Sequence, residues 1–240
     1  MHPLIARVTN TEWNDGGRRT DFSLDLEIAK SEIAKFSPSL TFITTPNNPT
    51  GSSVTISEIE DLAKVVPGLL VVDEAYAEFS DEISAVTLIE KYPNVVVIRT
   101  MSKAFSFAGV RLGYLVADKS AVDALFLVRL PYHLSALTQA AAEVALEFKG
   151  ELLGNVAQLI TQREWVKAQL EALDLHVVPS KANFLLFSGF DISAPLLWKS
   201  LLDAGVLIRD VGLSGHLRVT IGSEAENSLF IKALTAILHK

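Results

Sequence analysis

Residues 69–76 read Leu-Leu-Val-Val-Asp-Glu-Ala-Tyr, a short apolar run that ends in an acidic pair and a tyrosine. Two further segments have the same form: residues 40–51, LTFITTPNNPTG, and residues 95–103, VVVIRTMSK. Short runs rich in Val, Ile and Leu are typical of strands that are buried on both faces of a parallel sheet. Amphipathic stretches separate such runs, and this alternation predicts an α/β fold with a mainly parallel sheet flanked by helices.

The first half of the chain is predicted to form this sheet. Its strands are expected at residues 40–45, 69–72, 95–99 and 111–116. A helix is expected at residues 57–66, where Ser57 and Glu60 have the spacing of a capping box.

The second half is predicted to be a smaller α+β unit. Two long helices are expected at residues 120–148, capped by Ser120 or Asp123, and at residues 152–173. Further strands are expected at 176–178, 184–187, 207–209 and 217–221, and helices at 194–204 and 224–238. The last helix again has a capping-box pair, Ser223 and Glu226. We expect two domains, residues 1–130 and residues 131–240.

Composition narrows the classes of function. The 240 residues include 28 acidic and 21 basic side chains, and no basic cluster indicates nucleic acid or an anionic membrane as a partner. No apolar run reaches the roughly 18 residues of a membrane span. The absence of cysteine excludes disulfides and thiolate metal sites and is compatible with the cytoplasm. The five histidines have no metal-ligand spacing and no GxSxG motif is present, which disfavours a metal site and a hydrolase.

Polar residues follow each apolar run of the first half. They are Asn48 after the first run, Asp73 and Tyr76 after the second, Thr100, Ser102 and Lys103 after the third, and Arg111 at the start of the next predicted strand. Each alone could be a turn residue, a helix cap, a solvated lysine or part of a structural ion pair. Ligands bind beyond the carboxyl ends of parallel strands, so their joint occurrence in this order favours one shared site.

The chemistry of these groups suits pyridoxal 5'-phosphate (PLP). Lys103 can hold the aldehyde of PLP as a Schiff base, and Asp73 can keep the pyridine nitrogen protonated. Asn48 and Tyr76 can donate hydrogen bonds to the phenolic oxygen. A cationic, hydroxyl-rich group of residues would hold the phosphate: Arg111, Ser102 and Thr100.

The motifs resemble those of the class I and II aminotransferases, PLP enzymes of fold type I. In that family NNPTG, DEAY and SK, with an arginine eight residues further on, carry the roles given above. Within the family the chain is similar to the histidinol-phosphate aminotransferases. This similarity rests on TPNNPTG (45–51), VVDEAYAEF (71–79), RTMSKAFSFAGVRLGY (99–114), VRLPYHLS (128–135), SKANFLLF (180–187), GVLIRD (205–210) and LRVTIG (217–222).

The resemblance implies further assignments. Arg218 would bind the substrate carboxylate, Arg209 would help to hold a substrate phosphate, and Asn183 would face the active site. Arg218 could instead belong to a structural ion pair, and Arg209 could be an ordinary exposed arginine. The implied reaction is transamination between histidinol phosphate and 2-oxoglutarate in histidine biosynthesis, by a cytoplasmic homodimer.

Residues 1–3, Met-His-Pro, resemble an internal segment of the family's large domain. The resemblance therefore implies that an N-terminal portion is missing, with part of the phosphate site, an aromatic residue that stacks on the cofactor, and a tyrosine that reaches the neighbouring subunit. This implied loss leaves a catalytically silent truncated homologue as one alternative. Two others share most of the motifs: an aromatic amino-acid aminotransferase and an enzyme similar to threonine-phosphate decarboxylase.

Overall fold

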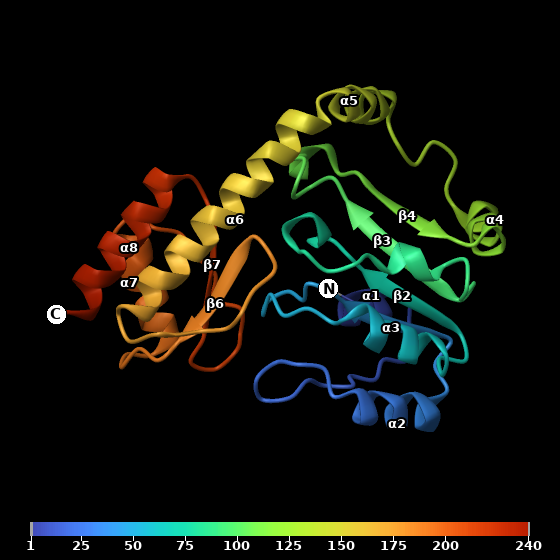
Figure 1. Cartoon of the computed structure of the whole chain (residues 1–240), viewed down its shortest axis with the longest axis horizontal. Helices are drawn as coiled ribbons and strands as arrows, with labels where there is room; N and C mark the ends of the chain where they lie inside the picture. Colours follow the sequence, from blue (N-terminus) through green and yellow to red (C-terminus); the bar gives the residue numbers. More distant parts are fainter. Residues whose placement is uncertain (1, 240) are drawn as a thin grey trace.

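The computed structural model describes residues 2–239, which form two sheets, each with its own helices (Figure 1). In this part of the chain the first sheet has the strand order β1-β2-β3-β4 and the second has the order β5-β6-β7. The strands are β1 Leu40–Thr44, β2 Leu69–Asp73, β3 Val95–Thr100, β4 Gly113–Ala117, β5 His176–Val177, β6 Phe184–Ser188 and β7 Leu217–Thr220. The long helix α6 (Lys149–Glu171) runs diagonally from the side of the first sheet to the second (Figure 1).

The first sheet is mainly parallel, as the sequence predicts. Strands β1, β2 and β3 run parallel, and β4 pairs antiparallel with β3. Thr44 lies opposite Asp73, and Asp73 lies opposite Ile98, so the carboxyl ends of the three parallel strands meet at one edge. Side chains that follow these strands are thereby placed near one another.

Helices α2 (Leu26–Phe36) and α3 (Ile56–Ala63) pack on one face of this sheet together with the 3-10 helix η2 (Ala85–Leu88). Their shared core contains Ile33, Ile59, Leu62, Leu70, Val72, Leu88, Val95 and Val97. The short helix α1 (His2–Val8) and α2 were not predicted. Two more 3-10 helices are η1 (Ala77–Phe79) and η3 (Ala108–Val110).

The capping box of α3 lies two residues earlier than predicted. Thr55, not Ser57, is the N-cap, and its side chain accepts a hydrogen bond from the Glu58 N–H while Glu58 accepts one from the Thr55 N–H. The predicted pair and the observed pair have the same spacing, so the sequence alone cannot decide between them. Thr55 has the extended backbone that an N-cap requires, with φ of −71° and ψ of 155°.

The prediction of a single helix at residues 120–148 was wrong. It is divided into α4 (Lys119–Val128) and α5 (Ala136–Glu147), separated by an irregular segment that contains Pro131. Proline lacks an N–H donor and disfavours helical geometry in the residue before it, so the helix ends there. Asp118, rather than Ser120 or Asp123, caps α4 by accepting the Ser120 N–H at 2.9 Å.

The second sheet is antiparallel and packs against α6, α7 (Ala194–Asp203) and α8 (Glu224–Leu238). Its core contains Val166, Leu170, Leu185, Phe187, Leu197, Leu201, Leu217, Phe230 and Leu234. The predicted capping box of Ser223 and Glu226 is confirmed. The strand predicted at residues 207–209 is reduced to one bridge between Arg209 and Arg218. The division into domains at residue 130 stays a prediction.

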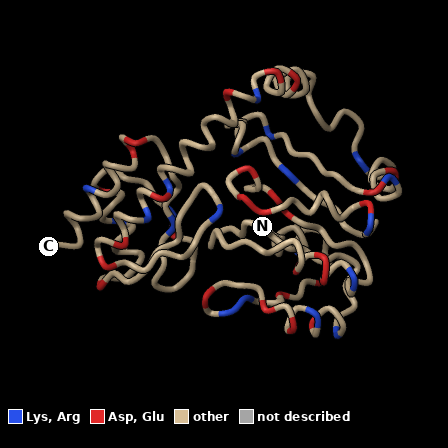
Figure 2. Tube along the Cα trace, viewed as in Figure 1, with Lys and Arg blue, Asp and Glu red and all other residues tan. Residues whose placement is uncertain are grey.

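Charged side chains of both signs are interspersed along both halves of the trace (Figure 2). Between residues 2 and 239, none of the helices combines the length and the apolar character that crossing a membrane requires.

Candidate functional site

The candidate site lies where β1 and β2 end. Because Thr44 pairs with Asp73, the turn that carries Asn48 begins beside Asp73. The side-chain nitrogen of Asn48 lies 3.5 Å from the phenolic oxygen of Tyr76. The Nζ atom of Lys103 lies 5.8 Å from the centroid of the Tyr76 ring. The structure thus brings together residues from three of the polar segments that the sequence singles out.

The amino group of Lys103 has an environment that favours its neutral form. Burial lowers the pKa of Lys103 from the ordinary value of lysine, and the cations Arg218 and Arg111 lower this pKa further. A buried ammonium loses hydration, and a positive neighbour disfavours a second positive charge. A neutral amine can attack an aldehyde, and this is the form in which a lysine acts as a nucleophile.

Asp73 has a neighbour, His2, that no sequence pattern indicates. Its carboxylate lies 3.6 Å from Nε2 of His2, and the His2 ring stacks on Phe42 with 4.5 Å between the centroids. Burial raises the pKa of Asp73, against the effects of the Ala75 N–H and of His2. A cation beside Asp73, such as a protonated ring nitrogen, would favour the ionised form of this carboxyl group. No local pattern marks His2, because its contact depends on the tertiary fold.

The predicted phosphate ligands lie close to Lys103 in the chain. The Thr100 hydroxyl donates to Ser102 Oγ at 2.9 Å and accepts the Ser102 N–H at 3.1 Å. Arg111 was predicted to begin β4, but it precedes this strand and has a left-handed conformation with φ of 59°. The 3-10 helix η3 takes up the preceding residues and delays the strand to Gly113. The Arg111 side chain is exposed, and its Nη1 donates to the Ala108 carbonyl at 3.0 Å.

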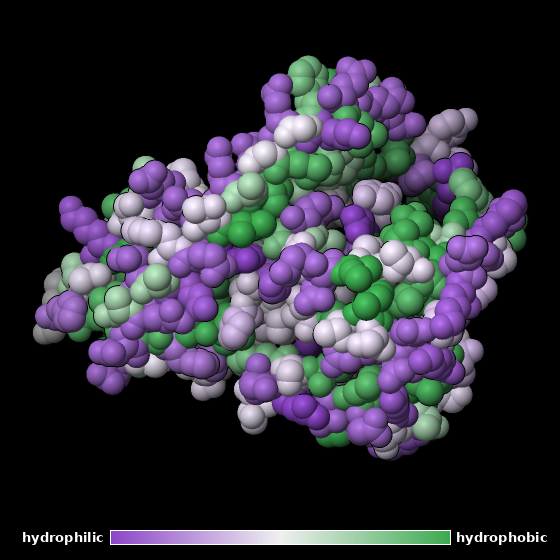
Figure 3. Space-filling model, in the orientation of Figure 1, coloured by the Kyte–Doolittle hydropathy of each residue, from purple (hydrophilic) through white to green (hydrophobic). Residues whose placement is uncertain are grey.

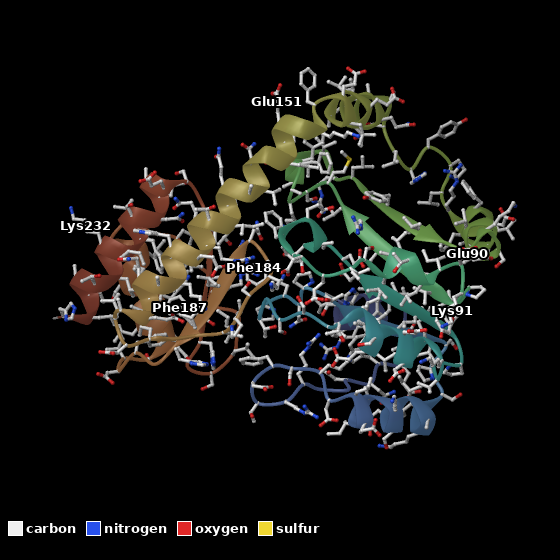
Figure 4. The ribbon with its side chains drawn as sticks, viewed as in Figure 1. Glu90, Lys91, Glu151, Phe184, Phe187 and Lys232 are labelled. Atoms are coloured by element: carbon white, nitrogen blue, oxygen red, sulfur yellow. The ribbon has the colours of Figure 1, made fainter. Side chains whose placement is uncertain are left out.

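Arg218, on β7 of the second sheet, reaches across to the first half. Its Nη1 donates to the side-chain oxygen of Asn48. Its guanidinium carbon lies 4.6 Å from the ring centroid of Phe184, and Phe184 packs edge-on against Tyr76 at 5.2 Å. Figure 4 places Phe184 on the side of the second sheet that faces the first. The Nε atom of Arg218 is buried without a hydrogen-bond partner among residues 2–239. Such an unpaired donor is suited to an anionic ligand.

The two other residues implied by the resemblance lie beside Arg218. Arg209 exchanges both backbone hydrogen bonds with Arg218, at 3.0 and 2.9 Å, and its side chain is exposed. Arg209 is also close enough to lower the pKa of Arg218, although burial contributes more to that shift. The carbonyl of Asn183 accepts the Ile221 N–H at 2.9 Å and ties β6 to the segment after β7.

Two contacts that join the halves were missed by the sequence reasoning. Arg163 of α6 is buried, and its Nη1 donates to the carbonyls of Phe79 at 3.3 Å and Ala182 at 2.9 Å. The Lys181 N–H donates to the carbonyl of Gly51, in the NNPTG turn, at 2.8 Å. These contacts hold the second sheet where Arg218 can reach Asn48.

The arrangement can hold an aldehyde through Lys103, a cationic ring nitrogen through Asp73 and an anion through Arg218. Within residues 2–239 no group of three or more His, Cys, Asp or Glu side chains is placed to hold a metal ion.

The family described as aminotransferase class I and II matches residues 4–234 of the chain. The chain is 54% identical over 238 residues to the histidinol-phosphate aminotransferase of Mycobacterium ulcerans (strain Agy99), covering 99% of this chain and 62% of that protein. It is 55% identical over 233 residues to the histidinol-phosphate aminotransferase of Nocardia farcinica (strain IFM 10152), covering 97% and 60%. The chain therefore spans about three fifths of the length of these curated relatives.

Solved structures of aminotransferases have a fold similar to that of this chain. The histidinol-phosphate aminotransferase of Sinorhizobium meliloti in complex with pyridoxal-5'-phosphate has a TM-score of 0.84 at 27% identity, covering 92% of this chain and 63% of that one. The histidinol-phosphate aminotransferase of Clostridium acetobutylicum has a TM-score of 0.91 at 24% identity, covering 99% and 74%. At that identity the second likeness shows the fold alone, which is that of PLP-dependent transferases of fold type I.

Proposed function

We propose that this chain, which belongs to the aminotransferase class I and II family, is a PLP-dependent aminotransferase. The proposed reaction is amino transfer between histidinol phosphate and 2-oxoglutarate in histidine biosynthesis. One observation carries the proposal: the half-buried Lys103, with its lowered pKa, lies against Tyr76 at the edge where Asp73 and Asn48 also lie. The names of the relatives support the choice of substrate.

The residues present fit PLP. Lys103 would hold its aldehyde carbon, Asp73 its ring nitrogen, and Asn48 with Tyr76 its phenolic oxygen. A cationic and hydroxyl-bearing group of side chains would hold the phosphate: Arg111, Thr100 and Ser102. When bound, PLP supplies an electron sink that makes the α-proton of an amino substrate removable.

The chain's own residues move the proton and bind the substrate. Lys103, as a neutral amine, is the general base that takes the α-proton of the substrate and the general acid that returns it. Arg218, with its unpaired Nε, holds the anionic group of the substrate, and Arg209 beside it adds a second positive charge for a phosphate. Asn183 contributes through the segment that it anchors between β6 and β7.

The test of the cofactor site uses Lys103→Ala. The unaltered chain is mixed with PLP and treated with borohydride, and mass spectrometry of peptides locates the pyridoxyl group. We expect the group on Lys103, loss of this labelling in Lys103→Ala, and unchanged labelling in Lys119→Ala, which alters an exposed lysine of α4. A folded chain that takes up no pyridoxyl group at Lys103 would contradict the proposal and favour the silent homologue.

The test of the substrate compares histidinol phosphate with phenylalanine and threonine phosphate as reactants. We expect preference for histidinol phosphate, and a larger loss of activity for this substrate than for phenylalanine in Arg209→Met. Preference for phenylalanine would favour an aromatic amino-acid aminotransferase, and release of carbon dioxide from threonine phosphate would favour a decarboxylase.

The proposal includes a cytoplasmic homodimer. Exposed apolar side chains on and between β4, α4 and α5 support the homodimer, because exposed apolar patches often mark interaction sites. In Figure 3 hydrophobic residues lie among hydrophilic ones on this part of the molecule. The exposed residues are Tyr114, Leu115, Leu125, Phe126, Leu127, Val128, Leu130, Tyr132, Leu137, Val144, Leu146 and Phe148. Light scattering after size exclusion should give twice the mass of the chain. Leu127→Glu should lower this mass, whereas Leu196→Glu on α7 should not; a monomeric parent chain would refute the homodimer.

A further inference from the structure

A second contact crosses between the two halves near the contact of Asn48 with Arg218. The rings of Phe22 and His216 meet edge to face, with 5.6 Å between centroids and an angle of 83° between planes. Phe22 lies in the loop before α2, and His216 directly precedes β7. Both side chains are partly exposed, so neither ring is simply a core residue.

The Phe22 ring is held in place by an unusual backbone. Its φ is +65°, a left-handed conformation that is rare for a bulky residue and persists only where the surroundings fix it. Two donors converge on the Phe22 carbonyl: Nη1 of Arg18 at 3.2 Å and Oγ of Ser52 at 3.1 Å. Arg18 also donates to the carbonyl of Thr44, at the end of β1, at 3.2 Å. The backbone of Phe22 is therefore anchored to the turn that follows β1 and to the end of that strand, which carry the candidate site.

His216 lies at the start of the strand that carries Arg218. It directly precedes β7, two residues before Arg218, and its Nδ1 lies 2.8 Å from the carbonyl oxygen of Ser214. Arg209 lies directly opposite Arg218 in an antiparallel pair, and such partners share a face. Arg218 and Arg209 thus share a face of the second sheet. Arg218 contacts the first half through Asn48, and His216 contacts it through Phe22.

We propose that Phe22 and His216 form an aromatic wall that receives the planar heteroaromatic ring of the amino substrate and so determine its specificity. This inference rests on the proposed function, because it takes Arg218 and Arg209 as the residues that hold the anionic end. In this proposal a ligand held by Arg218 extends its side chain from the contact of Arg218 with Asn48 towards the contact of Phe22 with His216. Each ring offers an apolar surface at a fixed angle, which suits stacked and edge-on contact with a third ring.

The expected gain follows from the strength of aromatic pairs. One such contact is worth enough to change affinity by about two- to tenfold. The test therefore compares two ligands that differ only in the side chain that carries the ring. L-Histidinol phosphate carries an imidazolylmethyl group, and phosphoethanolamine has the same amine and phosphate without it.

The experiment measures the dissociation constants of both ligands by calorimetry, for the full chain and its variants. Phe22→Leu removes the ring from the first half and His216→Gln removes it from the second. Two matched controls change exposed residues of the same type elsewhere: Phe36→Leu at the end of α2 and His176→Gln on β5. Circular dichroism checks that each protein is folded.

We expect each wall variant to weaken histidinol phosphate by about two- to tenfold and to leave phosphoethanolamine within twofold. The controls should change neither constant. Equal losses for both ligands would reduce the pair to a structural contact between the halves and would overturn the proposal. So would equal affinities of the two ligands for the unaltered chain. Failure of the proposed function is recognised separately, by the lack of a pyridoxyl group on Lys103.

Discussion

Gly51→Ala would measure how closely the two halves pack beside the site. Gly51 has φ of +78°, where a residue with a Cβ costs about 1–2 kcal/mol. The added Cβ would lie 2.1 Å from Oγ, 2.5 Å from Cβ and 2.9 Å from Cα of Ser180. Ser180 is itself held, since its Oγ donates to the Phe184 carbonyl at 2.7 Å and accepts the Ala182 N–H at 3.1 Å.

The clash must therefore move backbone, and overpacking of this kind costs about 1–3 kcal/mol. Together with the conformational cost, we expect Gly51→Ala to lower the free energy of unfolding by roughly 2–5 kcal/mol. Binding of histidinol phosphate should also weaken, because the movement separates Arg218 from Asn48 in the same turn.

The assay is urea unfolding followed by circular dichroism. Gly154→Ala is the matched control, because Gly154 lies in the exposed part of α6, where an added Cβ would have no heavy atom within 4 Å. Alanine should stabilise that helix by about 0.5–1 kcal/mol. Adding Ser180→Gly to Gly51→Ala should recover part of the loss, because it removes two of the three close atoms. A loss below about 1 kcal/mol for Gly51→Ala would refute the close packing on which this reasoning depends.

Two further predictions concern site residues, and a third concerns the contact between the halves. Burial raises the pKa of Asp73 above its value in the unfolded chain, so ionisation of Asp73 at neutral pH destabilises the folded protein. Asp73→Asn should therefore raise the Tm of the cofactor-free chain at pH 7 and lose this advantage near about pH 3, where the carboxyl group is protonated in both states. The same variant should bind PLP more weakly. Arg218→Met removes a cation that lowers the pKa of Lys103, so the pH midpoint of pyridoxylation at Lys103 should rise; an unchanged midpoint would contradict this coupling. Arg163→Met leaves two buried carbonyls without their donor and should cost roughly 3 kcal/mol in urea unfolding, whereas no loss would mean that water replaces the guanidinium.

Sequence patterns predicted the parallel strands and their polar ends because both depend on local order. A run such as LLVVD fixes a buried strand, and parallel pairing then brings its carboxyl end beside those of its neighbours. The break between α4 and α5 was also available from sequence, since Pro131 marks it, but the apolar residues on either side concealed it. The left-handed backbone of Phe22 and Arg111 was not available, because neither residue type indicates it.

Long-range contacts account for the rest of what was missed. His2 beside Asp73 and Arg163 beneath the interface each depend on segments that the fold, not the local sequence, brings together. On a long helix such as α6, an arginine that is buried at an interface has the same local pattern as one that faces solvent. Burial distinguishes them, and burial is a property of the assembled halves.

The division of the site between two sheets has a functional consequence. The residues proposed to hold PLP, including Lys103 and Asp73, lie in or just after strands of the first sheet. Arg218 belongs to the second sheet and meets Asn48 across 170 residues of sequence. A change that loosens the contact between the halves should therefore weaken binding of the substrate more than binding of PLP. Gly51→Ala provides this separation: we expect pyridoxylation of Lys103 to persist while the affinity for histidinol phosphate falls. Equal losses of both would mean that the two halves do not divide these roles.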